Sequence, residues 1–110
     1  MTADVRHVAA LVERSDGSLL VAEADGRIVG SLIAGWDGWR GNMYRLAVLP
    51  EYRRRGIALR LVAEGERRLR EQGAIRIGAI VLRDHPDAVG FWQAAGYTFQ
   101  EDAGRFVKTA

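Results

Sequence analysis

Apolar residues in the first half of the chain fall into short runs that turn residues separate, and this pattern predicts β-strands. Segments 18–24 and 27–35 are two such runs, and Asp25-Gly26 between them is a strong signal for a two-residue hairpin turn. A third strand is predicted over 43–49, where the proline that follows ends it. The first half is therefore expected to form an antiparallel meander.

Two further segments of the first half differ from this pattern. Residues 4–14 are predicted to form a short helix, because their apolar side chains fall on one helical stripe. The stripe consists of Val5, Val8, Ala9 and Val12. The segment 36–42, WDGWRGN, is expected to be a loop or a distorted hairpin end.

Helical spacing is clearest over residues 57–72. Ile57, Leu61, Gly65 and Leu69, with Ala58 and Val62 beside them, make an apolar face. Glutamates four residues before arginines provide favourable pairs on the polar side. These pairs are Glu64 with Arg68 and Glu66 with Arg70, and the glycine after residue 72 is a natural helix end.

The remainder of the chain is predicted to form a strand, a second helix and a final strand or hairpin arm. Residues 74–82 end in a nearly continuous apolar run, as in a strand covered on both faces. A second helix is predicted over 86–95, with Pro86 in its first turn. Residues 97–101 and 104–108 are expected to form a final strand or hairpin arm. The order of elements predicts a mixed α/β domain, a meander followed by a strand–helix–strand crossover.

Length and composition narrow the class of protein. The 110 residues suffice for a single domain over 1–110. Hydrophobic residues are 48% and charged residues 27%, which is ordinary for a globular protein, and no apolar run approaches the length of a membrane span. The absence of cysteine excludes disulfides, thiolate catalysis and cysteine metal sites. No metal site and no membrane partner are expected, and the N-terminus is a poor signal peptide, so a cytoplasmic location is expected.

The charge is balanced overall but concentrated locally. Sixteen basic residues, of which 15 are arginine, stand against 14 acidic ones, for a formal net charge of +2. A general nucleic-acid surface is therefore weakly supported. Arginine suits bidentate contacts with phosphate, so the run Arg53-Arg54-Arg55 matters more than the total.

The segment 46–61, LAVLPEYRRRGIALRL, joins a predicted strand to the predicted helix and has the features of a phosphate-binding loop. A helix N-terminus presents unpaired N–H groups and a partial positive charge. Gly56 allows the backbone to approach a ligand closely, and the arginines before it add charge. A lone arginine–glycine turn is often only a solvated turn, but here strand, proline, basic glycine loop and amphipathic helix follow in order.

This segment resembles the signature of the Gcn5-related N-acetyltransferases, a basic residue or glutamine followed by x-x-Gly-x-Gly or Ala. Here it is Arg53-Arg54-Arg55-Gly56-Ile57-Ala58. A second family element, a short helix with aromatic, three residues, Gly, aromatic, is similar to residues 88–97, AVGFWQAAGY. The resemblance covers about residues 4–108. It implies a GNAT-like acyl-CoA N-acyltransferase fold, with a central mixed, mostly antiparallel sheet flanked by helices.

The resemblance implies acetyl-CoA as cosubstrate. In the family the pantetheine arm pairs with the strand before the loop, here Leu46, Ala47 and Val48, and an N–H near Val48 stabilises the tetrahedral oxyanion. The pyrophosphate-binding residues would be Arg53, Arg54, Arg55, Gly56, Ile57 and Ala58. Trp92 would lie along the pantetheine and thioester, whereas Phe91 is expected to pack in the core.

Catalysis in the family is direct attack of a bound amine on the thioester, with a base or water chain removing a proton. The family often has a tyrosine at the position of Trp92, as the acid that protonates the departing thiolate. An indole N–H donates hydrogen bonds but is no practical acid, so either the thiolate leaves without a protein acid or another group serves. The candidates are Tyr44 and Tyr97, and Tyr97 is equally compatible with a place in the core. His85 stands where the family often has asparagine, and it either caps the second helix or contacts the cofactor. Asp37 is the candidate base.

The family usually has another strand and helix before the equivalent of residues 4–14, which this sequence lacks. The strand at 18–24 is therefore expected to have an exposed edge, and a homodimer is predicted to cover it.

Three functions remain open. The first is an acetyl-CoA-dependent N-acetyltransferase with a small-molecule or peptide amine as acceptor. The second is a non-catalytic acyl-CoA-binding module, which Trp92 and the absence of an evident base favour. The third, a nucleic-acid-binding domain, predicts steep salt dependence and is disfavoured by the balanced charge. The loop 36–42 is expected to contact the acceptor, with Asp37 attracting a cationic amine. Trp36 and Trp39 are expected to form an aromatic surface there, or else a packed corner or a dimer contact.

Overall fold

The computed structural model describes residues 8–14, 18–82 and 84–109. It divides into two compact units, which cover residues 1–80 and 81–110 and are described separately. The first unit holds the sheet and the long helix. The second holds the short helix and the C-terminal segment. The expectation of a single domain stays a prediction.

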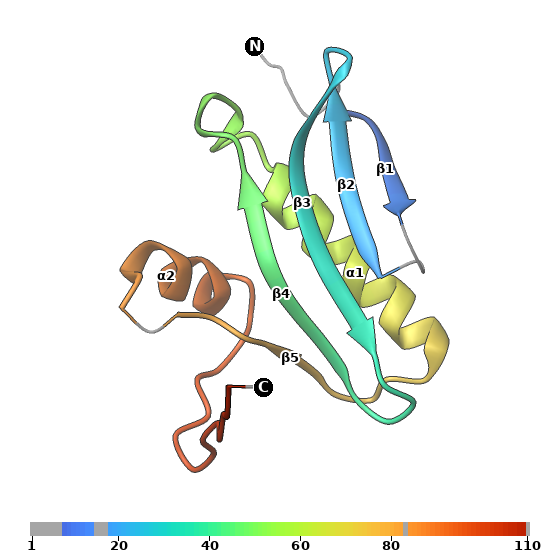
Figure 1. The fold of residues 1–110 in the computed structure, drawn as a ribbon. Coiled ribbons are helices and arrows are strands. Elements are labelled where there is room, and N and C mark those ends of the chain that lie inside the picture. Colours follow the sequence, from blue (N-terminus) through green and yellow to red (C-terminus); the bar gives the residue numbers. More distant parts are fainter. Residues whose placement is uncertain (1–7, 15–17, 83, 110) are drawn as a thin grey trace. The chain divides into compact units, whose positions relative to one another are not determined.

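The first unit is built on a five-stranded mixed sheet in the order β1-β2-β3-β4-β5 (Figure 1). Its strands are β1 Val8–Arg14, β2 Leu19–Ala24, β3 Arg27–Trp36, β4 Gly41–Val48 and β5 Ile77–Ala79. Strands β2, β3 and β4 form the predicted antiparallel meander, β1 adds a fourth antiparallel strand beside β2, and β5 lies parallel to β4 after the helical crossover. The mixed fold class is thus confirmed, and Asp25 and Gly26 form the β2–β3 turn with φ of 53° and 74°.

The helix predicted over 4–14 is wrong where the structure describes it, because residues 8–14 form β1. This strand pairs antiparallel with β2, from Arg14 opposite Leu19 to Val8 opposite Ala24, with an irregularity between Val8 and Ala10. Inter-strand bonding to β2 overrides the helical stripe, which is a weak local signal. Residues 4–7 lie outside the described residues. The same pairing corrects a second expectation, because the outer edge of β2 is covered by β1.

Helix α1, Ile57–Gln72, begins and ends as predicted. Gly56 and Gly73 flank it, both in the left-handed region with φ of 80° and 118°. The helix lies across one face of the meander (Figure 1) and buries its apolar stripe there. The stripe comprises Ile57, Leu61, Val62, Gly65 and Leu69, and it packs on a sheet core that includes Leu20, Leu32 and Met43.

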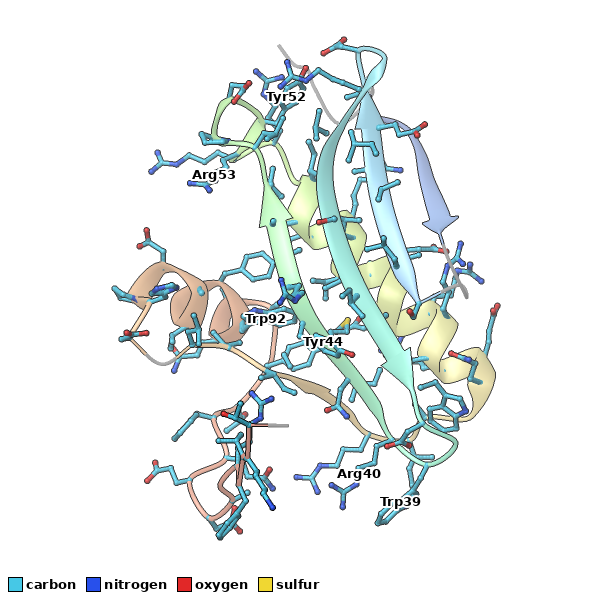
Figure 2. All side chains as sticks on the ribbon, in the orientation of Figure 1. Trp39, Arg40, Tyr44, Tyr52, Arg53 and Trp92 are labelled. Carbon is cyan, nitrogen blue, oxygen red and sulfur yellow. The ribbon has the colours of Figure 1, made fainter. Side chains whose placement is uncertain are left out.

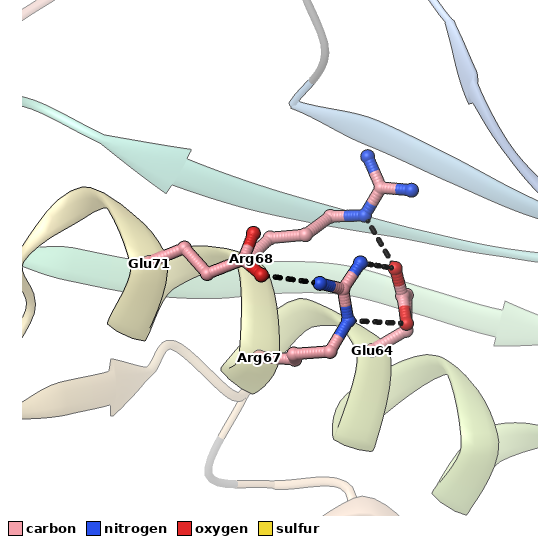
Figure 3. Close-up of polar contacts among 4 residues, drawn as sticks. All are labelled: Glu64, Arg67, Arg68 and Glu71. Atoms are coloured by element: carbon pink, nitrogen blue, oxygen red, sulfur yellow. Dashed lines mark hydrogen bonds and ion pairs between the residues drawn. The ribbon is translucent and has the colours of Figure 1, made fainter.

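The opposite face of α1 carries an ion-pair network (Figure 3). The predicted pair of Glu64 with Arg68 is present at 2.7 Å, and that of Glu66 with Arg70 at 3.6 Å. Arg67 bridges Glu64 and the carboxylate of Glu71, and these hydrogen bonds raise its pKa. The pairs favour the helical conformation, and those that involve the exposed side chains of Arg67, Arg70 and Glu71 contribute little to stability.

The strand predicted over 74–82 is much shorter in the structure. Pairing with β4 covers Ile77, Gly78 and Ala79. One further bond, from the N–H of Ile80 to the carbonyl oxygen of Met43 (2.9 Å), continues the parallel ladder. The apolar run indicated burial on both faces, but Ile80 is half-exposed (51%), so the run extends beyond the paired strand.

The second unit contains α2, Pro86–Ala94, close to the predicted bounds. The ring of Trp92 meets the rings of Phe91 and Tyr97 edge to face, with centroids 5.4 Å and 5.0 Å apart. The strand or hairpin arm predicted over 97–101 and 104–108 does not form. A strand needs a neighbouring edge to satisfy its backbone, and the local apolar pattern carries no information about such a partner. In the part of the chain that the structure describes, no helix is long and apolar enough to cross a bilayer.

Candidate functional site

A β-bulge interrupts β4 just before the predicted cofactor segment. Ser31 pairs with Ala47 and Ile33 pairs with Tyr44, so β4 has one more residue than β3 between these two pairs. Within the bulge Arg45 has a φ of 57°, which non-glycine residues rarely adopt. Such strained positions cluster at ligand sites, and here the bulge changes the course of β4 immediately before Leu46.

Beyond the bulge, β4 continues without the parallel partner that it has at its start. The register with β5 covers Gly41 to Met43, whereas β4 runs on to Val48. The N–H of Leu49 donates to the carbonyl of Val29 (2.8 Å) and so faces β3. Because backbone groups alternate along a strand, the N–H of Val48 faces the other way, toward the side on which β5 no longer pairs. The structure thus brings Leu46, Ala47 and Val48 to an open strand edge.

A tight turn connects this edge to α1. The short 3-10 helix η2, Pro50–Tyr52, ends with the N–H of Arg53 bonded to the carbonyl of Pro50 (3.2 Å). Nε of Arg53, which Figure 2 labels beside the loop, donates to the carbonyl oxygen of Val48 at 3.1 Å. Arg53 therefore fixes the loop to the strand end, a role that its sequence position alone does not reveal.

The start of α1 has the features expected of a phosphate site. Arg54 and Gly56 both have positive φ, 64° and 80°, and Gly56 occupies the N-cap position without any side chain to cap the helix. The first helical bond runs from the N–H of Arg60 to the carbonyl of Gly56 (3.0 Å). The preceding N–H groups, including those of Ile57 and Ala58, lack a capping side chain and can donate to an anion.

One aromatic residue beside this loop was missed by the sequence-based reasoning. Tyr52 is buried, with 9% of its surface exposed, and its hydroxyl donates to Oδ2 of Asp25 at 2.6 Å. That hydrogen bond is the main reason why the pKa of Tyr52 is raised. The guanidinium of Arg55 lies 5.0 Å from the ring centroid. The only available signal was the aromatic residue before three arginines, and Asp25 was interpreted simply as a turn residue.

The predicted base, Asp37, lies in the β3–β4 turn. Its Oδ1 accepts hydrogen bonds from the N–H groups of Arg40 (2.6 Å) and Trp39 (2.8 Å), and these bonds lower the pKa of the carboxyl. The turn lies at the opposite end of β4 from Val48, as the labels of Trp39 and Tyr52 show in Figure 2. The structure thus gives Asp37 a turn-stabilising role, and its role as a base stays a prediction.

The two tryptophans near this turn differ in their surroundings. Trp36 lies beside the end of α1, with its ring carbons 3.8 Å from where a Cβ on Gly73 would stand. Trp39 is exposed (73%), and the guanidinium of Arg40 lies over its ring at 4.3 Å. The expected packed corner therefore describes Trp36, and the expected aromatic surface describes Trp39.

Tyr44 lies on β4 opposite Ile33, and its hydroxyl is 3.5 Å from where a Cβ on Gly35 would stand. It is half-buried and directly precedes the bulge at Arg45. In the second unit, His85 occupies the N-cap position of α2 but makes no side-chain capping bond, so the expected capping role is wrong. The cofactor roles of His85 and Trp92 stay predictions. Among the described residues, no three His, Asp or Glu side chains gather as a metal site.

Comparison with known proteins identifies the relatives of this chain. The model of the acetyltransferase (GNAT) family matches residues 2–97. An acetyltransferase of Yersinia pestis is 39% identical over 82 residues, which are 74% of this chain and 58% of that protein. An acetyltransferase of Pectobacterium atrosepticum is 41% identical over 78 residues, 71% of this chain and 55% of that protein. The chain therefore spans somewhat more than half the length of these relatives.

Solved structures share the fold at lower sequence identity. The aminoglycoside N-acetyltransferase AAC(6')-Iy in complex with CoA aligns with a TM-score of 0.71 and 22% identity, over 84% of this chain and 66% of that one. A GNAT family acetyltransferase of Streptococcus pneumoniae aligns with a TM-score of 0.69 and 23% identity, over 84% and 70%. These likenesses concern the fold, and they extend over most of the chain.

Proposed function

The chain belongs to the acetyltransferase (GNAT) family, and from that premise we propose that it transfers an acetyl group from acetyl-CoA to a primary amine. The observation that carries the proposal is the open edge of β4 directly followed by a helix start that no side chain caps. An extended pantetheine arm can pair with the first, and a diphosphate can accept hydrogen bonds from the second. Few other ligands combine an extended amide-containing arm with a diphosphate.

The proposed cofactor residues bind different portions of the cofactor. Leu46, Ala47 and Val48 provide the strand edge for the pantetheine amides. Gly56, Ile57 and Ala58 provide backbone donors for the diphosphate, with Arg54 and Arg55 adding positive charge beside them. Arg53 acts indirectly, since it bonds the carbonyl of Val48. His85 and Trp92 belong to the second unit, and the cofactor roles that the family resemblance implies for them stay predictions.

The proposed reaction is direct transfer within a ternary complex. The amine nitrogen attacks the thioester carbonyl carbon, the carbonyl oxygen becomes an oxyanion near the N–H of Val48, and the C–S bond then breaks as the amide forms. A water chain takes the proton of the amine and passes it to solvent or to a base such as Asp37 at the other end of β4, and the departing thiolate takes a proton from solvent or from Tyr44.

The acceptor is proposed to be a small molecule or a peptide with a free amine. Solved neighbours include aminoglycoside acetyltransferases, one of them bound to a bisubstrate analogue of CoA and an acetylneamine, which supports a small-molecule amine.

A homodimer is also proposed. Because β1 covers β2, the outer edge of β1 is the strand edge that such a dimer would cover, and light scattering at micromolar concentration tests it.

Calorimetric titration with acetyl-CoA tests the cofactor site. Wild type should bind with micromolar affinity, and Gly56→Trp should not, because a bulky side chain at φ of 80° blocks the loop. Gly38→Trp is the matched control, since Gly38 also has positive φ (93°) but lies in the β3–β4 turn. Absence of binding by folded wild type, or equal loss in the Gly38 variant, contradicts the proposal.

A non-catalytic acyl-CoA-binding module is the second candidate. Trp92 favours it, because an indole cannot protonate a leaving thiolate as a tyrosine can. Release of free CoA in the presence of a panel of amines separates the two. Turnover well above the rate without protein supports the transferase, whereas binding without turnover for any amine supports the module.

A further inference from the structure

Four side chains join the β2–β3 turn to the segment that leads into the phosphate loop. The hydroxyl of Tyr52 donates to Oδ2 of Asp25 at 2.6 Å, and Nη2 of Arg27 pairs with Oε2 of Glu51 at 3.2 Å. We name these four residues the turn clasp. Asp25 lies in the β2–β3 turn, Arg27 begins β3, and Glu51 and Tyr52 lie in η2, so both contacts are tertiary and bridge segments 24 or more residues apart.

Tyr52 is the centre of the clasp. Its side chain is buried although the residues on either side of it in the sequence are exposed, and two guanidinium groups lie near its ring. The Cζ atom of Arg27 is 5.7 Å from the ring centroid and that of Arg55 is 5.0 Å away. Both distances are within the range in which an aromatic face attracts a cation. The ring thus connects the β2–β3 turn with an arginine of the phosphate loop.

The three consecutive arginines of the loop have different surroundings. Arg53 donates to the carbonyl of Val48, and Arg54 has a positive φ. Arg55 directly precedes the αL glycine at the start of α1, and within the described part of the chain it has no carboxylate partner. A guanidinium held at an aromatic face keeps its N–H donors at its rim, where they can bind phosphate oxygens in pairs.

We propose that Asp25 and Tyr52 are positioning residues that hold Arg55 ready for a phosphate group of acyl-CoA. Without the ring, the long side chain of Arg55 would have to be ordered on binding, which costs affinity. Without Asp25, the tyrosine hydroxyl loses the acceptor that fixes the ring. The proposal rests on the proposed cofactor function, and it makes the β2–β3 turn a part of the cofactor site that touches no ligand itself.

A double-mutant cycle on the affinity for CoA tests this coupling. Arg55→Ala should weaken binding about tenfold, and Tyr52→Leu by a similar factor. The double variant should bind about as weakly as Arg55→Ala alone, because Tyr52 acts through Arg55. Arg70→Ala is the control for loss of one exposed arginine away from the loop, because Arg70 lies in the last turn of α1, and it should bind like wild type.

Conservative variants separate positioning from general structure. Tyr52→Phe keeps the ring but loses the bond to Asp25, and about a threefold loss of affinity is expected. Asp25→Ala should cause the same loss of affinity for CoA, because it removes the same hydrogen bond. Asp25→Asn should retain near wild-type affinity, since an amide oxygen accepts the same bond and asparagine tolerates a φ of 53°. Melting curves for each variant confirm that it is folded.

The outcomes distinguish the two proposals. Binding by wild type with independent, multiplicative losses in the cycle, about a hundredfold for the double variant, overturns the positioning role and leaves the cofactor function intact. Failure of folded wild type to bind CoA overturns both. Repeating the cycle with 3'-dephospho-CoA identifies the phosphate concerned: an unchanged Arg55 effect indicates the diphosphate, and its loss indicates the 3'-phosphate.

Discussion

At the scale of single residues, several polar side chains of the first unit support or strain the backbone. Asp37 accepts hydrogen bonds from two N–H groups of its own turn, and Arg53 donates to the carbonyl of Val48. Arg45 is exposed but holds a left-handed backbone conformation inside β4. Substitutions can measure what these residues contribute to the stability of the folded chain.

Asp37→Ala should destabilise the protein near neutral pH, because two backbone N–H groups of an exposed turn lose their acceptor. The two hydrogen bonds lower the pKa of Asp37 in the folded state. Their contribution to stability is therefore fully present above the pKa of the unfolded chain, about 4, and is lost as the pH falls through the pKa of the folded protein. Urea unfolding at pH 7 and pH 3 should therefore show a difference between wild type and variant that shrinks in acid. A constant difference would contradict this role.

Arg45→Val should destabilise the protein by about 1 kcal/mol, since a β-branched residue fits the left-handed region poorly. Arg45→Gly should remain within about 1 kcal/mol of wild type because glycine adopts this φ freely. Urea unfolding measures both values. Equal stability of the two variants would show that the backbone of the bulge is not strained in solution.

At the scale of elements, β5 pairs only with the first residues of β4, and Gly78 is the middle residue of this short pairing. Gly78 lies opposite Asn42, and a Cβ on Gly78 would be 2.6 Å from the side-chain oxygen of Asn42. Real Cβ atoms do not approach so closely. A side chain at position 78 would therefore require the side chain of Asn42 to move.

Gly78→Ala should lower the free energy of unfolding by about 1 kcal/mol, because Asn42 must move out of a half-buried position. In an Asn42→Ala background the same change should cost little or be favourable, since alanine suits a strand better than glycine does. The double-mutant cycle by urea unfolding gives the coupling directly. Equal costs in both backgrounds would exclude the steric explanation.

At the scale of the whole molecule, the antiparallel meander and α1 form one frame whose two ends differ. One end carries the β3–β4 turn with Asp37 and Trp39, and the other carries η2, the phosphate loop and the turn clasp (Figure 2). The proposed cofactor residues of the first unit gather at the second end. Ligand binding there should be visible in the stability of the folded chain.

Acetyl-CoA at about 100 times its Kd should stabilise the folded protein by about 2.7 kcal/mol. The melting temperature should rise accordingly, and the rise should shrink with added salt because the loop arginines are exposed. Differential scanning calorimetry at low and high salt measures both effects. Gly56→Trp should show no rise, and a salt-independent rise would argue against arginine–phosphate contacts.

Much of the fold could be predicted because its signals are local. Turn chemistry identified the Asp25-Gly26 hairpin, and spacing with a flanking glycine identified both ends of α1. Local features also indicated the tight loop at 53–58, whose binding of phosphate stays a prediction. The bulge at Arg45 and the contact of Tyr52 with Asp25 could not be predicted, because each depends on a strand or turn distant in the sequence.

The sequence by itself determined the meander, the helix α1 and the loop before it, since hydrophobic spacing, glycine and proline act within a few residues. Only the tertiary structure decided that residues 8–14 pair with β2, that β5 pairs briefly with β4, and that residues 97–101 and 104–108 form no strand. The physical reason is that a strand is defined by the edge with which it pairs. Short apolar runs are compatible with several partners or with none, so the assembled sheet makes the choice.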